Sequence, residues 1–386
     1  MSMTTIVNGQ VLLPSGDFAE TSVRLDGDHI AGLGGASDGR EIDATGLWVL
    51  PGMIDIHGDA FERQMMPRPG VHVDHAIAFM DTDRQLVSNG ITTAFHGITY
   101  SWEPGLRGAE QCRSVLDAIE ELRPSFGCDA RTHLRWETYN LDAVEEVAEW
   151  IAAGRIDLLA FNDHAPTILK RVLSPEKKKL GEYTGRTGLT EQDFVDLAKR
   201  VAARKDDVPG AIERLAAAAV KAGVAQLSHD DTTAETRGWY NGLGCTVAEF
   251  PMTDEAADEA LRLGNPIVLG APNVMRGGSH NGSLDAAVNV AAGRCDILAS
   301  DYYYPSMLAA AFRLVRDGRC SFPEAWARVS RNPALAAGLS DRGEIAQGAR
   351  ADLVLVDPET SAGPQVRATI AGGAIVYDSG PARNGI

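Results

Sequence analysis

Two side chains near the start of the chain are spaced for metal chemistry. His57 and Asp59 lie two residues apart in the stretch PGMIDIHGDAFE, which covers residues 51–62. The apolar run from Met53 to Ile56 predicts a buried parallel strand, and side chains two apart on a strand point to the same face. An imidazole and a carboxylate presented together suit a divalent cation. The pair also fits an ordinary hydrogen bond between the two side chains. The positions of the other metal-capable residues in the chain are therefore needed to choose between a metal site and a hydrogen-bonded pair.

Metal-capable side chains recur at the carboxyl ends of nearly all the strands that the sequence predicts. The series is His57 with Asp59, His96, Glu137, His164, His229 with Asp230 and Asp231, Glu249 and Asp301. In a barrel of parallel strands these ends converge on one face, so residues far apart in sequence meet there. Each residue alone also fits a satisfied core or surface group. Their shared position predicts one metal site.

The elements that must position these residues form an α/β pattern. Apolar, strand-like runs lie at 53–57, 91–96, 130–137, 156–163, 224–229, 246–250, 266–271 and 296–301. Amphipathic stretches between most of them, such as 109–122, 141–153 and 308–317, predict helices. Eight strand–helix units predict a (β/α)8 TIM barrel over residues 51–338. The basic, glycine-punctuated stretch 174–194 predicts a long loop over the barrel mouth.

The two ends of the chain depart from this pattern. Residues 1–50 and 339–386 contain short strand-like runs broken by glycine turns, such as TIVNGQVLL and GEIAQGARADLVLVD. Two such pieces at opposite ends can pair into one sheet domain. We therefore predict a small β-sandwich domain formed by the N- and C-terminal segments.

Composition narrows the class of protein. A formal net charge of −17 over 386 residues argues against a nucleic-acid partner. No apolar run approaches the roughly 18 residues of a membrane span, and the N-terminus lacks the layout of a signal peptide. Five widely spread cysteines without a C-x-x-C motif fit a reducing compartment. We expect a cytoplasmic protein with a small-molecule substrate and no membrane partner, and leave open whether it forms a homo-oligomer.

Longer motifs carry a resemblance to a known family. They include HGDAFE (57–62), HLRWE (133–137), NDHAP (162–166), YTGRTGLT (183–190), SHDDTT (228–233), LGAPNVMRGGSHNG (269–282) and DILASDYYYP (296–305). With these motifs the chain resembles the amidohydrolase superfamily of metal-dependent hydrolases, and within it the PhnM-like diphosphatases of phosphonate breakdown. The resemblance implies hydrolysis of α-D-ribose 1-methylphosphonate 5-triphosphate to the 5-phosphate and pyrophosphate. The alternative is cleavage of a C–N bond on the same scaffold, as in a deacetylase, cyclic amidase or deaminase.

The resemblance also implies a set of metal ligands. They are His57, Asp59, Glu137, His164, His229 and Asp301. Asp59 replaces the second histidine of the usual H-x-H, and Glu137 takes the bridging role because the chain has no lysine before residue 170. Zinc is the expected metal, with manganese, iron or magnesium as alternatives. The superfamily has a histidine where this chain has Glu249, which leaves open one or two ions and a ligand role for Glu249 or His96.

Catalysis is assigned to Asp301 and His229. A divalent cation lowers the pKa of a bound water to about 7. A carboxylate at the end of the last strand is placed to take the proton of that water and to pass it to the leaving group. Asp230 and Asp231 either orient His229 or cap the following helix.

A phosphorylated substrate also requires positive groups. Arg276, Ser279 and His280 lie in a glycine-containing stretch directly after the predicted seventh strand, where barrels of this kind commonly bind phosphate. Arg68, after the first motif, and Arg186, inside YTGRTGLT, are further candidates. The lysine run at 177–179 fits a solvated surface as well as a binding role.

Overall fold

A barrel of eight parallel strands forms the centre of the molecule. The computed structural model describes all residues except 1–2, 38, 173, 175–179, 279–283 and 381–386. The strands are β8 (Met53–Gly58), β9 (Ile91–Tyr100), β10 (Asp129–Glu137), β11 (Leu158–Asn162), β12 (Ala225–His229), β13 (Val247–Glu249), β14 (Ile267–Gly270) and β15 (Ile297–Ala299). They pair in sequence order, and a bridge between Gly58 and Asp301 joins the last strand to the first. The predicted TIM barrel is confirmed.

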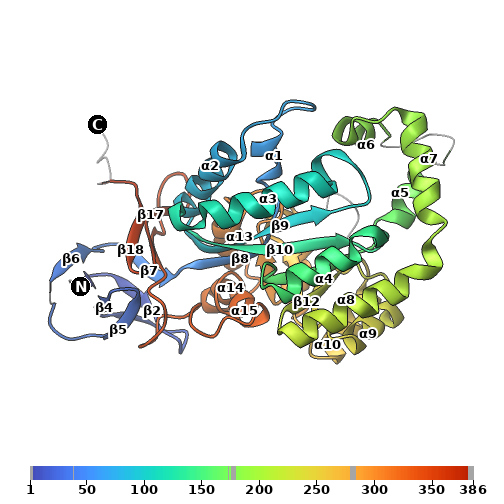
Figure 1. Ribbon diagram of the computed structural model, residues 1–386. Coiled ribbons are helices and arrows are strands. Elements are labelled where there is room, and N and C mark those ends of the chain that lie inside the picture. Colours follow the sequence, from blue (N-terminus) through green and yellow to red (C-terminus); the bar gives the residue numbers. More distant parts are fainter. Residues whose placement is uncertain (1–2, 38, 173, 175–179, 279–283, 381–386) are drawn as a thin grey trace.

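Helices surround the barrel (Figure 1). They are α1 (Glu62–Met65), α2 (His75–Ser88), α3 (Ala109–Leu122), α4 (Val144–Ala152), α5 (Ala165–Val172), α6 (Leu180–Thr187), α7 (Glu191–Ala202), α8 (Val208–Ala222), α9 (Ala234–Gly242), α10 (Asp254–Arg262), α11 (Ala271–Arg276), α12 (Ala286–Ala291), α13 (Ser306–Arg316), α14 (Phe322–Ala327) and α15 (Arg331–Ala336). Short 3-10 turns are η1 (Gly105–Arg107), η2 (Arg123–Ser125), η3 (Leu141–Ala143) and η4 (Lys205–Asp207). None of the described helices combines the length and the apolar character needed to cross a membrane.

Several helix starts follow from local sequence. The side chains of Asp74, Thr190, Thr233 and Thr253 accept hydrogen bonds from backbone N–H groups in the first turns of α2, α7, α9 and α10. Such caps satisfy donors that have no partner within the helix. The loops at the carboxyl ends of β12 and β13 are therefore short, because a capped helix begins soon after each strand.

The long loop predicted over 174–194 is wrong for the residues that the structure describes. Helices α6 and α7 occupy most of this stretch. Their buried side chains, with those of α5, form a separate small core: Ile168, Val172, Leu180, Tyr183, Phe194 and Ala198. Apolar residues three or four positions apart and the cap at Thr190 support helices despite the glycines. The lysine run at 177–179 lies outside the described residues.

The small sheets at the chain ends pair as predicted. One sheet contains β5 (His29–Leu33), β4 (Val23–Asp26), β1 (Thr4–Val7) and β6 (Arg40–Asp43). The other contains β18 (Ala374–Asp378), β17 (Gln365–Ala371), β16 (Leu353–Asp357), β7 (Trp48–Pro51), β2 (Gln10–Leu12) and β3 (Phe18–Glu20). Antiparallel pairing of β7 with β16 joins the two chain ends, and apolar residues of both sheets share one core. The exact division at residues 50 and 339 stays a prediction.

Candidate metal and substrate site

Strand register brings the candidate residues to one level of the barrel. Glu137 lies opposite Asn162, Asn162 opposite His229, and His229 opposite Glu249, on four neighbouring strands. The seam between the first and last strands adds His57 and Asp301, because the Asp301 N–H donates to the His57 carbonyl at 2.9 Å. The carboxyl ends of the strands therefore gather these side chains at the barrel mouth.

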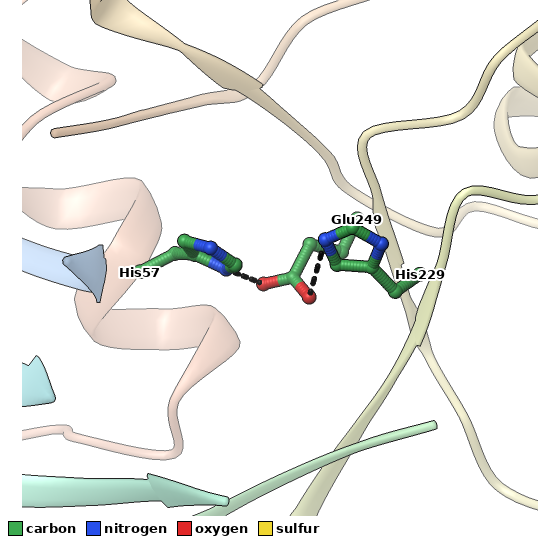
Figure 2. Close-up of side chains that lie close together, drawn as sticks. All are labelled: His57, His229 and Glu249. Carbon is green, nitrogen blue, oxygen red and sulfur yellow. Dashed lines mark hydrogen bonds and ion pairs between the residues drawn. The ribbon is translucent and has the colours of Figure 1, made fainter. Parts of the chain in front are cut away.

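A buried glutamate lies between two imidazole rings at the centre of this cluster. His57 Nδ1 lies 2.7 Å from Glu249 Oε1, and His229 Nε2 lies 4.0 Å from Glu249 Oε2 (Figure 2). A third ring approaches the same carboxylate, since His133 Nε2 lies 3.9 Å from Glu249 Oε1. Ligand atoms of His57, His229 and Glu249 all lie within 4.8 Å of one another, which is close enough to hold one cation.

Two further groups of possible ligands share these histidines. His164, His229 and Asp230 form one group, and His57, Asp59 and Asp301 form the other. In the first, the Asp230 carboxylate lies 3.4 Å from His164 Nε2 and 3.2 Å from His229 Nδ1.

Glu137 is linked to the first of these groups, because its Oε1 lies 2.6 Å from His164 Nδ1. Every metal-ligand candidate that the sequence predicts is thus near the cluster. Glu137 makes its contact through His164, and the described residues place it in none of the three groups.

Electrostatics favour neutral imidazoles at the centre of the site. Burial lowers the pKa of His57 to about 4 and that of His133 to about 3, although the charge of Glu249 opposes both shifts. Burial alone would raise the pKa of Glu249, but His57 and His133 bring it well below its ordinary range. His57 and His133 are therefore neutral near pH 7, the form in which histidine binds metals.

Two other groups titrate differently. Burial, followed by the charge of Asp59, raises the pKa of the Asp301 carboxyl to about 7. Burial would lower the pKa of His164, but Glu137 and Asp230 raise it to about 9. Asp301 and His164 thus both bind a proton more tightly than the free side chains do.

The donor set fits a divalent cation. Glu249 Oε2, Glu137 Oε2 and His133 Nε2 are buried and have no hydrogen-bond partner among the described residues. Leaving such atoms unpaired costs about 1–3 kcal/mol each, and a cation would satisfy the two carboxylate oxygens. Nitrogen and oxygen donors without cysteine suit zinc, manganese, iron or magnesium.

A cavity of about 420 Å³ opens above the cluster. Its lining includes six of the possible ligands, which are His57, Asp59, His164, His229, Asp230 and Asp301. The other lining residues are Ala60, Glu62, Arg63, Arg107, Arg135, Phe250, Asn273 and Tyr302. Arg107 is held by Glu62 through two hydrogen bonds of 3.1 and 2.8 Å, and Arg63 donates to the Tyr302 carbonyl. Three guanidinium groups therefore share the cavity with the cation site, which gives it the chemistry needed to bind an anionic substrate.

The predicted substrate-binding residues that the structure describes do not line this cavity. Arg68 and Arg276 are exposed, outside the residues that line this cavity, and Arg276 ends helix α11 rather than lying in a loop. Ser279 and His280 lie outside the described residues. Arg186 lines a neighbouring cavity of about 190 Å³. Its Nε and Nη2 donate hydrogen bonds to the two carboxylate oxygens of Glu103 at 2.7 and 2.6 Å. The binding roles of these residues stay predictions.

The structure gives the positions of residues whose roles the sequence left open. His96 packs edge-on against Phe61 and Phe79, away from the cluster, whereas Glu249 lies at its centre. Asp231 does not cap the next helix, because Thr233 does. Instead Asp231 accepts hydrogen bonds from Ser228 and Arg237 and so holds the turn that carries His229.

Sequence reasoning missed three residues that contact or line the cluster. His133 and Arg135 precede Glu137 at intervals of two on the same strand, so period-two alternation already places all three on one face. Phe250 directly follows Glu249, and its ring lies edge-on to His57 at 4.9 Å and to His229 at 5.4 Å. No simple sequence signal marks Phe250.

A TIM barrel with histidines and carboxylates gathered at its carboxyl ends defines a hydrolase of the metal-dependent kind. The sequence profile of the Amidohydrolase family matches residues 84–377, and the chain belongs to this family. It is 34% identical over 361 residues to alpha-D-ribose 1-methylphosphonate 5-triphosphate diphosphatase of Escherichia coli (strain K12), with 91% of each chain covered. The family resemblance is confirmed, and the protein is an enzyme, a hydrolase of the amidohydrolase superfamily, whose members use divalent metals.

More distant matches share the fold. The chain is 28% identical over 393 residues to an adenine deaminase of Cereibacter sphaeroides, covering 96% of this chain and 57% of the deaminase. A solved triazine hydrolase variant matches with a TM-score of 0.65 at 14% identity, covering 98% of this chain and 95% of that one. This last likeness shows the fold alone.

Proposed function

We propose that the protein hydrolyses α-D-ribose 1-methylphosphonate 5-triphosphate, releasing pyrophosphate and leaving the 5-phosphate. The observation that carries the proposal is the shared cavity, where Arg63, Arg107 and Arg135 face the histidine and carboxylate cluster. Negative charge develops on phosphate oxygens during phosphoryl transfer. Positively charged hydrogen-bond donors fixed around these oxygens lower the activation free energy of the reaction. The name of the Escherichia coli relative supports the same substrate.

We further propose zinc as the metal, with manganese, iron or magnesium as alternatives. His57, Asp59, Glu137, His164, His229 and Asp301 are the ligand candidates, to which the structure adds Glu249. When bound, a divalent cation supplies Lewis acidity and makes a coordinated water more acidic. The buried oxygen of Glu249 that has no hydrogen-bond partner among the described residues supports this assignment.

Residues of the chain carry out proton transfer, orientation of the site and phosphate binding. The Asp301 carboxylate takes a proton from the attacking water and delivers it to the departing pyrophosphate. His229, held by Asp230, stays oriented toward Glu249. The three arginines bind phosphate oxygens. All five cysteines are free thiols, which supports our placement of the enzyme in the cytoplasm.

A second candidate is hydrolysis of a C–N bond. The matches to adenine deaminases favour it, although the chain covers 57% of the first of them. A small neutral substrate would make no use of the positive charge of the three arginines that line the cavity. The first candidate therefore explains more of the site.

The test is a substrate screen on purified protein. Triphosphates, N-acyl compounds and aminopurines are offered with and without added metal, and pyrophosphate, carboxylate and ammonia are measured. We expect pyrophosphate release that depends on metal, and a loss of about 100-fold or more for Asp301→Asn. Asp317→Asn, at an exposed site on the end of α13, is the matched control. Ammonia release without pyrophosphate would reject the proposal in favour of the second candidate.

A further inference from the structure

Three arginines near the barrel are almost fully buried. The exposed side-chain fractions are 7% for Arg135, 0% for Arg237 and 5% for Arg342. Removing a guanidinium from water is expensive unless charges and hydrogen bonds replace the lost hydration. The partners of each arginine therefore indicate what the buried charge is for.

Two of the three make four hydrogen bonds each with the protein itself. Arg237 donates to Ser228, Asp231 and the carbonyls of Cys245 and Val247. Arg342 donates to Thr93, Asp129 and both carboxylate oxygens of Asp341. Both networks lie away from the cavity and connect structural elements. Arg237 Nε has no partner among the described residues either, but neither of these two arginines lines the cavity.

Arg135 is different. Among the described residues it makes one hydrogen bond, from Nη1 to Asp59 Oδ2 at 3.1 Å, and its buried Nε has no partner. Since a guanidinium carries five N–H donors, most of its capacity remains open. Arg135 also lines the cavity with His57 and Asp301. The open donors thus belong to a residue at the reaction centre.

The barrel is built to hold this side chain there. Arg135 lies two residues before Glu137 on β10, on the same strand face. On the neighbouring strand β9, Gly97 leaves room for the arginine stem, because a Cβ at that position would lie 3.2 Å from Arg135 Cδ. Glycine in a strand interior commonly marks such a close approach. The hydrogen bond that Arg135 donates to Asp59 holds the guanidinium group itself.

We propose that Arg135 is a substrate-binding catalytic residue that holds the oxygens of the phosphoryl group at the reaction centre. A planar guanidinium with free N–H groups pairs with a phosphoryl group through two parallel hydrogen bonds, which a single carboxylate partner such as Asp59 leaves available. Asp59 accordingly orients Arg135 as well as being a ligand candidate. This assignment rests on the proposed function for the identity of the substrate, but the anion site itself does not require turnover.

The test measures anion binding separately from catalysis. Inorganic phosphate is added to wild type and to Arg135→Gln, as purified and after metal removal, and affinity is obtained from calorimetry and from the rise in melting temperature. Loss of charged hydrogen bonds should weaken phosphate binding about 10- to 100-fold. Arg135→Lys keeps the positive charge but lacks the planar guanidinium group, so it should recover part of the phosphate affinity. The same variant replaces Arg135→Gln in the test if the glutamine variant does not fold.

Controls separate binding from stability. Arg342→Gln is expected to lower the melting temperature yet retain the response to phosphate, and exposed Arg262→Gln is expected to change neither. In turnover of the triphosphate, Arg135→Gln should lower kcat more than it raises KM, because the contact strengthens as charge develops.

The outcomes are distinct. Unchanged phosphate affinity in both Arg135 variants overturns the proposal, as does acetate binding as tight as that of phosphate, which would assign the residue to carboxylates. If wild type binds phosphate through Arg135 but releases no pyrophosphate from the triphosphate, the proposed function fails while the anion site stands.

Discussion

The backbone of Phe250 leads to a prediction about stability that the side-chain contacts alone would not give. Its φ of 52° lies in the left-handed region, which is uncommon for a bulky residue. The conformation is held because the Phe250 N–H donates to the Val268 carbonyl at 3.0 Å. This conformation places the Phe250 ring edge-on to the rings of His57 and His229. Strain of this kind is often retained where it positions a functional group.

Comparing Phe250→Ala with Phe250→Gly isolates the free-energy cost of the left-handed backbone conformation. Both Phe250→Ala and Phe250→Gly lose the ring, and each lost aromatic pair is worth about 0.5–1.5 kcal/mol. They differ in Cβ, which costs roughly 1–2 kcal/mol in the left-handed region. The greater entropy of unfolded glycine opposes this by about 0.5–1 kcal/mol. Glycine should therefore be more stable than alanine here, by up to about 1.5 kcal/mol, the reverse of the order at an ordinary strand position.

The assay is urea unfolding at pH 7.5 with both variants compared by linear extrapolation. Ala248→Gly, two residues earlier in β13, is the control, and there glycine should lower stability by about 0.5–1 kcal/mol. Turnover should fall by similar factors in both Phe250 variants, since each loses the same ring, even though their stabilities differ. If Phe250→Ala proves more stable than Phe250→Gly, the strain argument is refuted.

Two glutamate-to-glutamine substitutions extend the test to metal binding and to pH. Glu249→Gln removes the charge at the centre of the cluster, so metal affinity measured by competition with a chelator should fall by about 10-fold or more, whereas Glu259→Gln on α10 should leave it unchanged. Glu146 is different, because hydrogen bonds from Arg113 and Tyr100 lower its pKa below the ordinary 4.5, although partial burial opposes them. Its folded form thus binds protons more weakly than its unfolded form, and its stabilisation is present above pH 4.5 and lost as pH falls through the folded-state pKa. Glu146→Gln should lower the free energy of unfolding by about 1–2 kcal/mol at pH 7, and an equal difference at pH 3 would contradict this origin.

The strands and the cluster were predictable because both depend on short-range patterns. Each barrel strand is a short apolar run, and β8 is buried at all six positions, which favours a parallel strand with both faces covered. A polar residue at the carboxyl end of such a strand lies at the barrel mouth. His96 does not, because β9 continues beyond the predicted end at residue 96 to Tyr100. Hence His57, His229 and Asp301 were found from position alone.

The arginines that line the cavity were harder to predict, because the position of an arginine depends on packing and not on a sequence pattern. Arg276 looked suitable beside two glycines, but the preceding residues form helix α11 and leave its side chain exposed. Arg107 belongs to η1, whose place above the barrel depends on Gly105. A Cβ on that residue would lie 2.3 Å from the Arg186 carbonyl oxygen. Such contacts between segments distant in sequence cannot be read from either segment alone.

Closure of the barrel and assembly of the site are one physical event. Asp55, fully buried in β8, accepts hydrogen bonds from the N–H of Ser300 at 3.0 Å and from its hydroxyl, across 245 positions of sequence. The same carboxylate accepts from the His57 N–H at 3.2 Å. Asp55 therefore holds the seam on both sides: it lies two residues before His57, and its partner Ser300 directly precedes Asp301. The contact that closes the barrel thus also brings the two candidate residues His57 and Asp301 together.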